Sequence, residues 1–467
     1  MAIRDRRSLT RRRVLQQGLA AAVAGVVPAF ARAQDRYDQQ HLLDFAPVGN
    51  VTLIHVGDFL GQVHPHLMRP SAQKIARTGE RHLPEYLTDE LLRIRFGVGG
   101  RQPMDYALTA AHFEEDAAAY GPMGGIGHVK TVVEAIRARR PGAVLIAGEG
   151  AERLSPLEMT TPVQVIRPQK VPLAVIDLMD RDALSDQVVQ ARAEAAVVVC
   201  RSALGMAANR QIAWDVPGID LILCHGDAPA FPEVVRVQGT ALIASGTQGR
   251  FVTRIDLDVQ EGKLAGMAHR LIPVFGDLLA ASVVPDVVAA DTTKLGDAPH
   301  LLYRRGALSS TWDDLICGAM RQATGAQIAL VGGMQHGVSV LPGAPVTRAA
   351  VASVLWGQPG EARKRRMSGA EVAQVLQDAA EAVFHADPYQ RHKAAMMRGQ
   401  GITFGVDPDA AEGQKVSGLM LADGTSLDPA GRYDVVTWGA GAWGEPVSDV
   451  AAMIEDYLSA GLTPQPD

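Results

Sequence analysis

At four places in the first half of the sequence, a short apolar run ends in side chains that can do chemistry. Carboxylates and imidazoles can bind a divalent ion or transfer a proton, and a guanidinium can hold an anion. In a layered α/β sheet, functional groups collect at the carboxyl ends of the strands. Polar residues also follow strands in ordinary loops, so a turn without function is the alternative for each of them. The residues are Asp58, Glu149, the pair Cys200-Arg201 and the pair Cys224-His225.

Histidines and cysteines suggest two further sites. His55, His64 and His66 lie close together in the sequence and could coordinate a metal, or they could be ordinary core and loop residues. The chain has three cysteines, too few for a disulfide scaffold. We expect Cys200 and Cys224 to face one cleft, where they could pair or accept sulfur from a carrier. The alternative is that both are small core residues.

The elements that carry these residues alternate between strand and helix, as in a layered α/β sheet. Apolar β-rich runs predict the strands, and apolar periodicity predicts the helices. An alternating pattern over residues 249–272 predicts an antiparallel hairpin, and residues 67–112 indicate an irregular insertion. The other predicted strands are 51–56, 143–147, 173–177, 195–200 and 221–224, and the helices are 126–140 and 182–194.

A chain of 467 residues is too long for one hydrophobic core, so we expect at least two domains. An α/β domain is predicted at residues 45–275, and a connector rich in Ala, Val, Asp and Pro at 276–300. An α+β domain is predicted at 301–463. Its predicted helices are 311–323 and 368–384, and its predicted strands are 327–331, 416–421 and 433–438.

Residues 1–33 have the pattern of a twin-arginine signal peptide, which predicts export to the periplasm. The motif TRRRVLQ at 10–16 precedes an apolar run at 18–27 and a small-residue cleavage site at 31–33. A basic, disordered N-terminus is the alternative. No apolar run is long enough to span a membrane.

The body of the protein is acidic once this leader is set aside. The leader holds seven Arg and one Asp, so its removal takes the formal net charge from −6 to −12. Such a body argues against nucleic acid and anionic membranes as partners. It is compatible with a partner protein that has a basic patch.

Several motifs, in order, resemble the Sox-pathway thiosulfohydrolase family of the 5′-nucleotidase superfamily. The first strand, LIHVGDFLGQ at 53–62, is similar to the superfamily's metal-binding strand. The other matching segments resemble that family in order and spacing over nearly the whole mature chain. They are FEE at 113–115, YGPMGG at 120–125, LYRRG at 302–306, WDDLI at 312–316, LPG at 341–343, DPY at 387–389 and GEP at 444–446.

The resemblance implies a layered metallophosphoesterase-like N-terminal domain and an α+β 5′-nucleotidase-like C-terminal domain. It also implies an activity, because the Sox family removes a sulfonate group from the cysteine-linked sulfur chain of a carrier protein. Two manganese ions, roughly 3.5–4 Å apart, would activate water and neutralise the sulfonate oxygens. The implied partner is the Sox carrier protein or another Sox component.

Most of the family's metal ligands have no counterpart in this sequence. Asp58 matches the first position of the family's Asp-x-His, but Leu60 takes the place of the histidine. Glu149 stands one position before the expected bridging carboxylate, and the Asn-His pair that should follow is missing. Where the family has Ser-His after the next strand, this chain has Cys200-Arg201.

The family's Gly-His-x-His motif reads Cys224-His225-Gly226-Asp227, so the remaining candidate metal ligands are those four identified by resemblance. Two manganese ions need nearly the complete ligand set, whereas four scattered donors predict one weakly bound divalent ion or none. Arg201 would repel a metal, but its guanidinium could bind an anion directly. The four candidate ligands are Asp58, Glu149, His225 and Asp227.

The loop after strand 327–331 also departs from the family. Where the family presents an Arg and a Trp to the substrate, this chain has Gln335 and His336. These two residues and Arg201 are therefore the candidate cleft residues, and a loop residue without catalytic function is the alternative for His336.

The sequence is identified as a periplasmic Sox thiosulfohydrolase relative with weak or no hydrolysis, because its two-metal site is eroded. Two alternatives stay open: an active hydrolase with a rebuilt or single-metal site, and a non-catalytic subunit that binds the carrier or the active enzyme.

Overall fold

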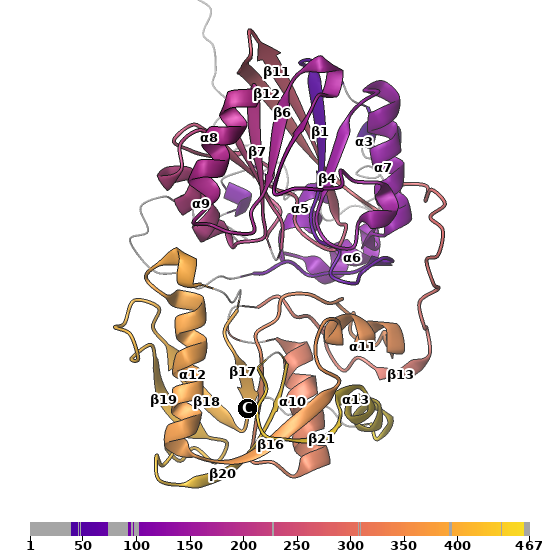
Figure 1. Cartoon of the computed structure of the whole chain (residues 1–467). Helices are drawn as coiled ribbons and strands as arrows, with labels where there is room; N and C mark the ends of the chain where they lie inside the picture. The colour runs from indigo at the N-terminus through magenta and orange to yellow at the C-terminus, as the bar shows by residue number, and fades with distance from the viewer. Residues whose placement is uncertain are drawn as a thin grey trace, which may run out of the picture.

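The computed structural model describes residues 39–44, 46, 48–72, 92–94, 97, 102–226, 228–306, 308, 310–391, 395–439 and 441–461. The predicted leader lies outside these residues, as does much of the predicted insertion. Within this part of the chain, no helix has the length and apolar character needed to cross a bilayer. The chain forms two domains, one above the other in Figure 1.

The first domain contains two β-sheets that pack face to face. Residues of both sheets, such as Leu53, Val199 and Leu223, form one buried apolar layer between them. Among the described residues, one sheet has the order β12-β11-β1-β4 and the other β5-β6-β7-β8-β10-β9. The strands are β1 Val51–Val56, β4 Val144–Ala147, β5 Val163–Ile166, β6 Leu173–Asp177, β7 Val197–Ser202, β8 Leu221–Cys224, β9 Val235–Val237, β10 Thr240–Ala244, β11 Phe251–Gln260 and β12 Lys263–Pro273.

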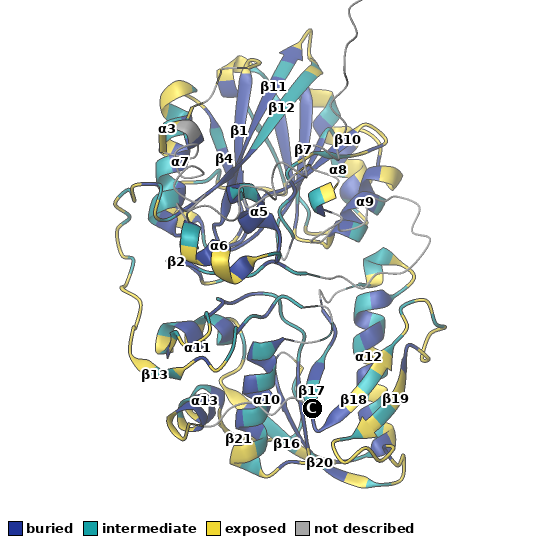
Figure 2. Ribbon diagram, turned by 180° about the vertical axis from the view of Figure 1, so that it is seen from behind, coloured by how far each residue is buried: buried dark blue, intermediate teal, exposed yellow. Residues whose placement is uncertain are grey.

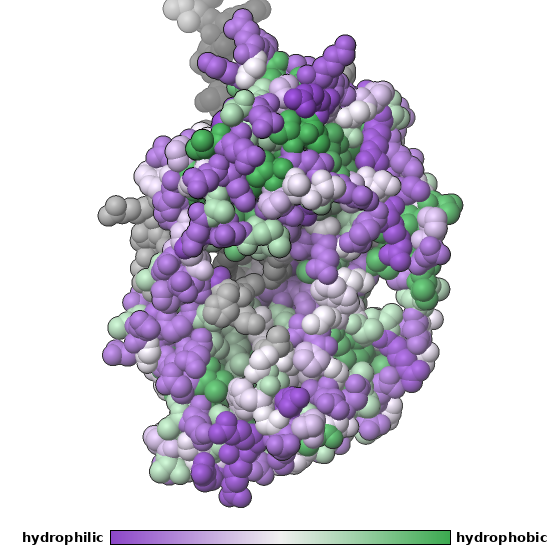
Figure 3. Space-filling model, in the orientation of Figure 1, coloured by the Kyte–Doolittle hydropathy of each residue, from purple (hydrophilic) through white to green (hydrophobic). Residues whose placement is uncertain are grey.

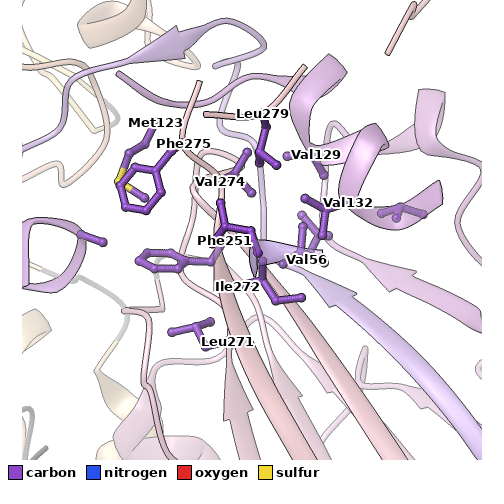
Figure 4. Packing of buried hydrophobic residues seen from close by; sticks show 14 of the residues in the cluster. Val56, Met123, Val129, Val132, Phe251, Leu271, Ile272, Val274, Phe275 and Leu279 are labelled. Carbon is purple, nitrogen blue, oxygen red and sulfur yellow. The ribbon is translucent and has the colours of Figure 1, made fainter. Parts of the chain in front are cut away.

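Helices cover the outer faces of both sheets. The first sheet packs on helix α7, Ile126–Arg139, through side chains such as Val56, Val129 and Val132 (Figure 4). The second sheet packs on helices α8, Leu184–Glu194, and α9, Met206–Asp215. Helices α3, Gln39–Leu42, α5, Pro103–Leu108, and α6, Phe113–Tyr120, and the ribbon of β2, Pro65–His66, with β3, Met123–Gly124, complete the domain. Both faces of each central strand are thus buried, as the dark strands of Figure 2 show.

Parallel strands bring the candidate residues to one edge of the domain. β1 and β4 are parallel, as are neighbours in the series β6, β7, β8 and β10. The loops that follow these strands therefore leave the sheets at their carboxyl ends, where α/β sheets collect functional groups.

The second domain is built on a sheet with the order β17-β14-β20-β16-β21. Helices α10, Thr311–Thr324, α11, Arg348–Leu355, and α13, Val450–Ser459, cover one face, and α12, Gly369–Phe384, covers the other. The strands are β13 Lys294–Asp297, β14 Ile328–Val331, β15 Pro345–Thr347, β16 Glu361–Ser368, β17 Arg398–Gln400, β18 Ile402–Val406, β19 Val416–Leu421, β20 Arg432–Trp438 and β21 Glu445–Asp449.

Local sequence signals explain where the two longest helices of this domain begin. Ser310 caps α10 by accepting a hydrogen bond from the Asp313 backbone, and Ser368 and Glu371 form a capping box at the start of α12. The connector differs from the expectation, because β13 lies inside residues 276–300 and pairs with β15 of the second domain.

Candidate functional site

The carboxylate of Asp58 joins the loops that follow β1, β4 and β8. Its Oδ1 accepts a hydrogen bond from the Glu149 backbone N–H at 2.9 Å, and its Oδ2 accepts one from the Gly226 backbone N–H at 2.9 Å. Gly148 makes room for this arrangement, since a Cβ there would lie 1.7 Å from Asp58 Oδ1. The side chain is buried, so these two hydrogen bonds take up most of its accepting capacity.

Of the other candidate ligands, the structure brings only His225 close to Asp58 among the described residues. His225 Nδ1 lies 3.3 Å from Asp58 Oδ1. The side chain of Glu149 is exposed, and only its backbone contacts Asp58. Asp227 lies outside the described residues.

Arg201 faces a carboxylate that sequence reasoning missed. Its Nε lies 3.7 Å from Oδ1 of Asp177, its register partner at the end of the parallel strand β6. This separation is too long for a hydrogen bond, so the guanidinium keeps donors for an anionic ligand. Asp177 ends its strand as Asp58 follows β1, and that common pattern was the available signal.

His55 lies beneath this edge and is a core residue. Its Nδ1 shares a hydrogen bond of 2.7 Å with Ser245 Oγ, which in turn contacts Thr253 Oγ1 at 2.7 Å. Burial, with smaller effects of the positive groups nearby, lowers the pKa of His55 to about 3. The imidazole is therefore neutral at physiological pH, held in a buried hydroxyl network.

The three clustered histidines do not form a metal-binding group. His64 Nε2 contacts the Val288 carbonyl at 2.8 Å, and His66 Nδ1 contacts the His64 carbonyl at 3.1 Å. Burial lowers the pKa of His66 to about 3. Within the described ranges, no group of three or more His, Cys, Asp or Glu side chains is arranged to hold a metal ion.

The expectation that Cys200 and Cys224 face the cleft is wrong. They lie on neighbouring strands, β7 and β8, but both belong to the buried cluster under α8 and α9. Both are free thiols, and burial raises the pKa of each to about 12. They are small core residues.

We expect the three native thiols to be unreactive toward a disulfide reagent at neutral pH until the protein is denatured. A buried thiol is neither accessible nor ionised, and Cys317 is buried as well. The measurement is a thiol titration before and after denaturation. A Val189→Cys variant, at an exposed position of α8, is the control that should react at once. Rapid labelling of Cys200 or Cys224 in the native protein would contradict the assignment.

Gln335 and His336 lie where the two domains meet. Gln335 Nε2 contacts the Gly306 carbonyl at 3.4 Å, and the His336 ring meets Trp356 edge-on with centroids 5.8 Å apart. Burial, with Arg304 and Arg305 nearby, lowers the pKa of His336 to about 4. Trp356 itself packs on Gly61, in the loop after β1, so His336 belongs to the domain interface.

Side chains from both domains fix this interface. Arg305 Nη2 donates to Thr247 Oγ1 at 2.9 Å, and Gln248 Nε2 contacts the Gly337 carbonyl at 3.5 Å. Thr247 and Gln248 follow β10, whose carboxyl end is part of the candidate edge. The molecular surface is hollowed where the domains meet (Figure 3).

Comparisons with known proteins agree with this architecture. Residues 290–444 match the model of the 5′-nucleotidase C-terminal domain family. The sulfate thiohydrolase SoxB of Thermus thermophilus superposes with a TM-score of 0.82 at 24% identity, covering 91% of this chain and 97% of SoxB. The chain has the two-domain fold of the 5′-nucleotidases. A search of curated protein sequences finds no match.

A 5′-nucleotidase precursor of the same organism shares this 5′-nucleotidase fold. It superposes with a TM-score of 0.64 at 15% identity, covering 89% of this chain and 97% of the precursor. The predicted fold class, a layered α/β domain followed by an α+β domain, is confirmed.

The described residues do not fit the two-metal centre associated with the 5′-nucleotidase fold. Of the four candidate ligands, Asp58 uses both carboxylate oxygens on backbone N–H groups, and Glu149 points to solvent. His225 is the remaining described donor beside Asp58. Two ions that share a site need nearly twice as many converging donors as this edge provides.

Proposed function

We propose that this protein is a SoxB-like member of the 5′-nucleotidase superfamily whose eroded two-metal site leaves weak or no hydrolytic activity. The observation that carries the proposal is the coordination of Asp58. A carboxylate that accepts two backbone hydrogen bonds at 2.9 Å cannot offer the same lone pairs to a metal ion. In place of a ligand cluster, the edge presents Asp58, His225 and the Arg201–Asp177 pair.

The proposed role is in sulfur oxidation, as a protein that binds the sulfur carrier or another Sox component. The support is the likeness in fold to the sulfate thiohydrolase SoxB together with the sequence motifs that resemble that family. Arg201 keeps guanidinium donors at the edge, and a sulfonate is an anion that such donors bind. A binding protein needs this recognition without the metal-activated water.

We also propose that the protein works in the periplasm after export by the twin-arginine pathway. The support is the motif TRRRVLQ at residues 10–16, with the apolar run and the cleavage pattern that follow it. Export as a folded protein would let a partner bind before secretion.

The test is metal analysis of protein exported in a native-like host supplied with manganese, with a sulfonate-release assay on the same sample. We expect far less than two manganese ions per chain and no sulfate release above background. A SoxB enzyme with the full ligand set is the positive control. Two ions per chain, together with sulfate release that a chelator abolishes, would overturn the proposal. One tightly bound ion with activity would favour the single-metal hydrolase instead.

A further inference from the structure

The two domains are fastened to each other along a central strip. The Ser339 backbone N–H donates to the Leu67 carbonyl at 2.7 Å, and the Arg69 backbone N–H donates to Ser339 Oγ at 2.9 Å. The Arg69 guanidinium also lies 4.5 Å from the centre of the Tyr303 ring. With the Arg305–Thr247 hydrogen bond, this strip holds the loops after β1 and β10 against the second domain.

A separate contact fastens the far side of the interface. The segment after α12 folds into a hook, residues 385–391, in which Asp387 Oδ1 accepts a hydrogen bond from the Tyr389 backbone. Tyr389 reaches the first domain, where its hydroxyl donates to Asp215 Oδ2 at 3.0 Å. The Arg181 guanidinium stacks 4.4 Å above its ring. Figures 1 and 2 both place the upper end of α12 close to α9, which carries Asp215.

The order of the strands places the candidate site between these two fastenings. The sheet runs β6-β7-β8-β10, and the loop after β10 belongs to the central strip. The loop after β6 carries Arg181, which contacts the hook. Arg201 on β7 and His225 after β8 lie between them. With strands about 4.8 Å apart, the edge between the fastenings is about 14 Å wide.

We propose that Tyr389 is a latch that holds the second domain closed over the carboxyl edge of β7 and β8. The central strip consists of backbone hydrogen bonds and packed rings, whereas the hook depends on one tyrosine between Asp215 and Arg181. The latch is therefore the end that can be released, with the strip as the pivot. The loop after β6 also joins Arg181 to Asp177, so the latch is continuous with the ion pair of Arg201.

Distance measurements between spin labels on the two domains test the latch. Labels are placed at Val189→Cys on α8 and Met420→Cys on β19, both exposed, in a chain whose native thiols are buried. The parent should give one narrow distance distribution. Tyr389→Ala should add a second, longer-distance population, and Tyr389→Phe a smaller one, because the ring still stacks on Arg181.

Tyr433→Phe is the matched control, since Tyr433 also uses its hydroxyl but within the second domain, as acceptor for the Asp428 backbone N–H. That variant should keep the narrow distribution. A narrow distribution in Tyr389→Ala would overturn the latch, as would a broad one in the parent. The measurement needs neither metal nor activity, so its failure and failure of the proposed function can be told apart.

Discussion

Asp313→Ala should lower the free energy of unfolding of the second domain by about 3–5 kcal/mol, the range for removing one partner of a buried ion pair. Asp313 is fully buried in α10. Its Oδ1 accepts hydrogen bonds from Arg304 Nε at 3.0 Å and Nη2 at 2.8 Å, and its Oδ2 accepts one from Arg398 Nη1 at 2.9 Å. The substitution would leave two buried guanidinium groups without their carboxylate.

The same triad shapes the loop that carries the cleft candidates. Arg398 donates to the carbonyls of Met334 at 3.2 Å and Gly306 at 2.7 Å, next to Gln335. Loss of Asp313 should therefore loosen the domain interface as well as the core. The triad went unnoticed in the sequence because WDDLI shows an amphipathic helix start and says nothing of two arginines distant in the chain.

Denaturant unfolding monitored by tryptophan fluorescence measures the effect of Asp313→Ala. Glu455→Ala is the control, because Glu455 pairs with Arg348 at 2.9 Å on the surface, with the two side chains 30% and 50% exposed. Exposed pairs contribute about 0–1 kcal/mol. Equal losses in the two variants would show that the triad contributes no more than a surface pair.

Strand prediction worked where a strand is buried on both faces and failed where it is not. Residues 51–56 and 221–224 are apolar runs that match β1 and β8 because sheets and helices bury both of their faces. β16 was missed, because its residues 363–366 are four consecutive basic side chains. Those side chains lie on a sheet of the second domain whose pairing no local pattern reveals.

The same burial on both faces explains the error about the cysteines. In β7, Val197 and Val199 point between the two sheets, whereas Val198 and Cys200 point under the helices. A strand that is apolar at every position has no period-two signal, so its sequence cannot say which parity faces which layer. The carboxyl-end rule located the edge correctly but could not orient residues within the strand.

At the candidate site, the sequence could identify which donors are missing but not how the remaining ones are used. The rule for strand ends brought Asp58 and His225 to one place, 3.3 Å apart. Whether Asp58 is a ligand or a loop anchor depends on the path of the backbone at Glu149 and Gly226. That path is set by glycines such as Gly148, whose neighbour in space lies ninety residues earlier in the chain.

Asp58→Ala should destabilise the first domain by about 2–4 kcal/mol in buffer that contains a chelator, because two backbone N–H groups lose their acceptor. Asp58→Asn should cost less, since its amide keeps one accepting oxygen. Glu149→Ala is the control, and because that side chain is exposed its effect should stay within about 0.5 kcal/mol. Denaturant unfolding of the three variants gives the comparison.

A metal-ligand role for Asp58 predicts the opposite pattern. Without metal, converging acidic ligands repel one another, so removing one would be neutral or stabilising. With manganese, the parent would gain stability in proportion to the logarithm of metal concentration, and Asp58→Ala would lose that gain. Here the parent should melt at the same temperature with and without manganese, while Asp58→Ala is weakened in both. A manganese-dependent rise in the parent that vanishes in Asp58→Ala would return Asp58 to the ligand set.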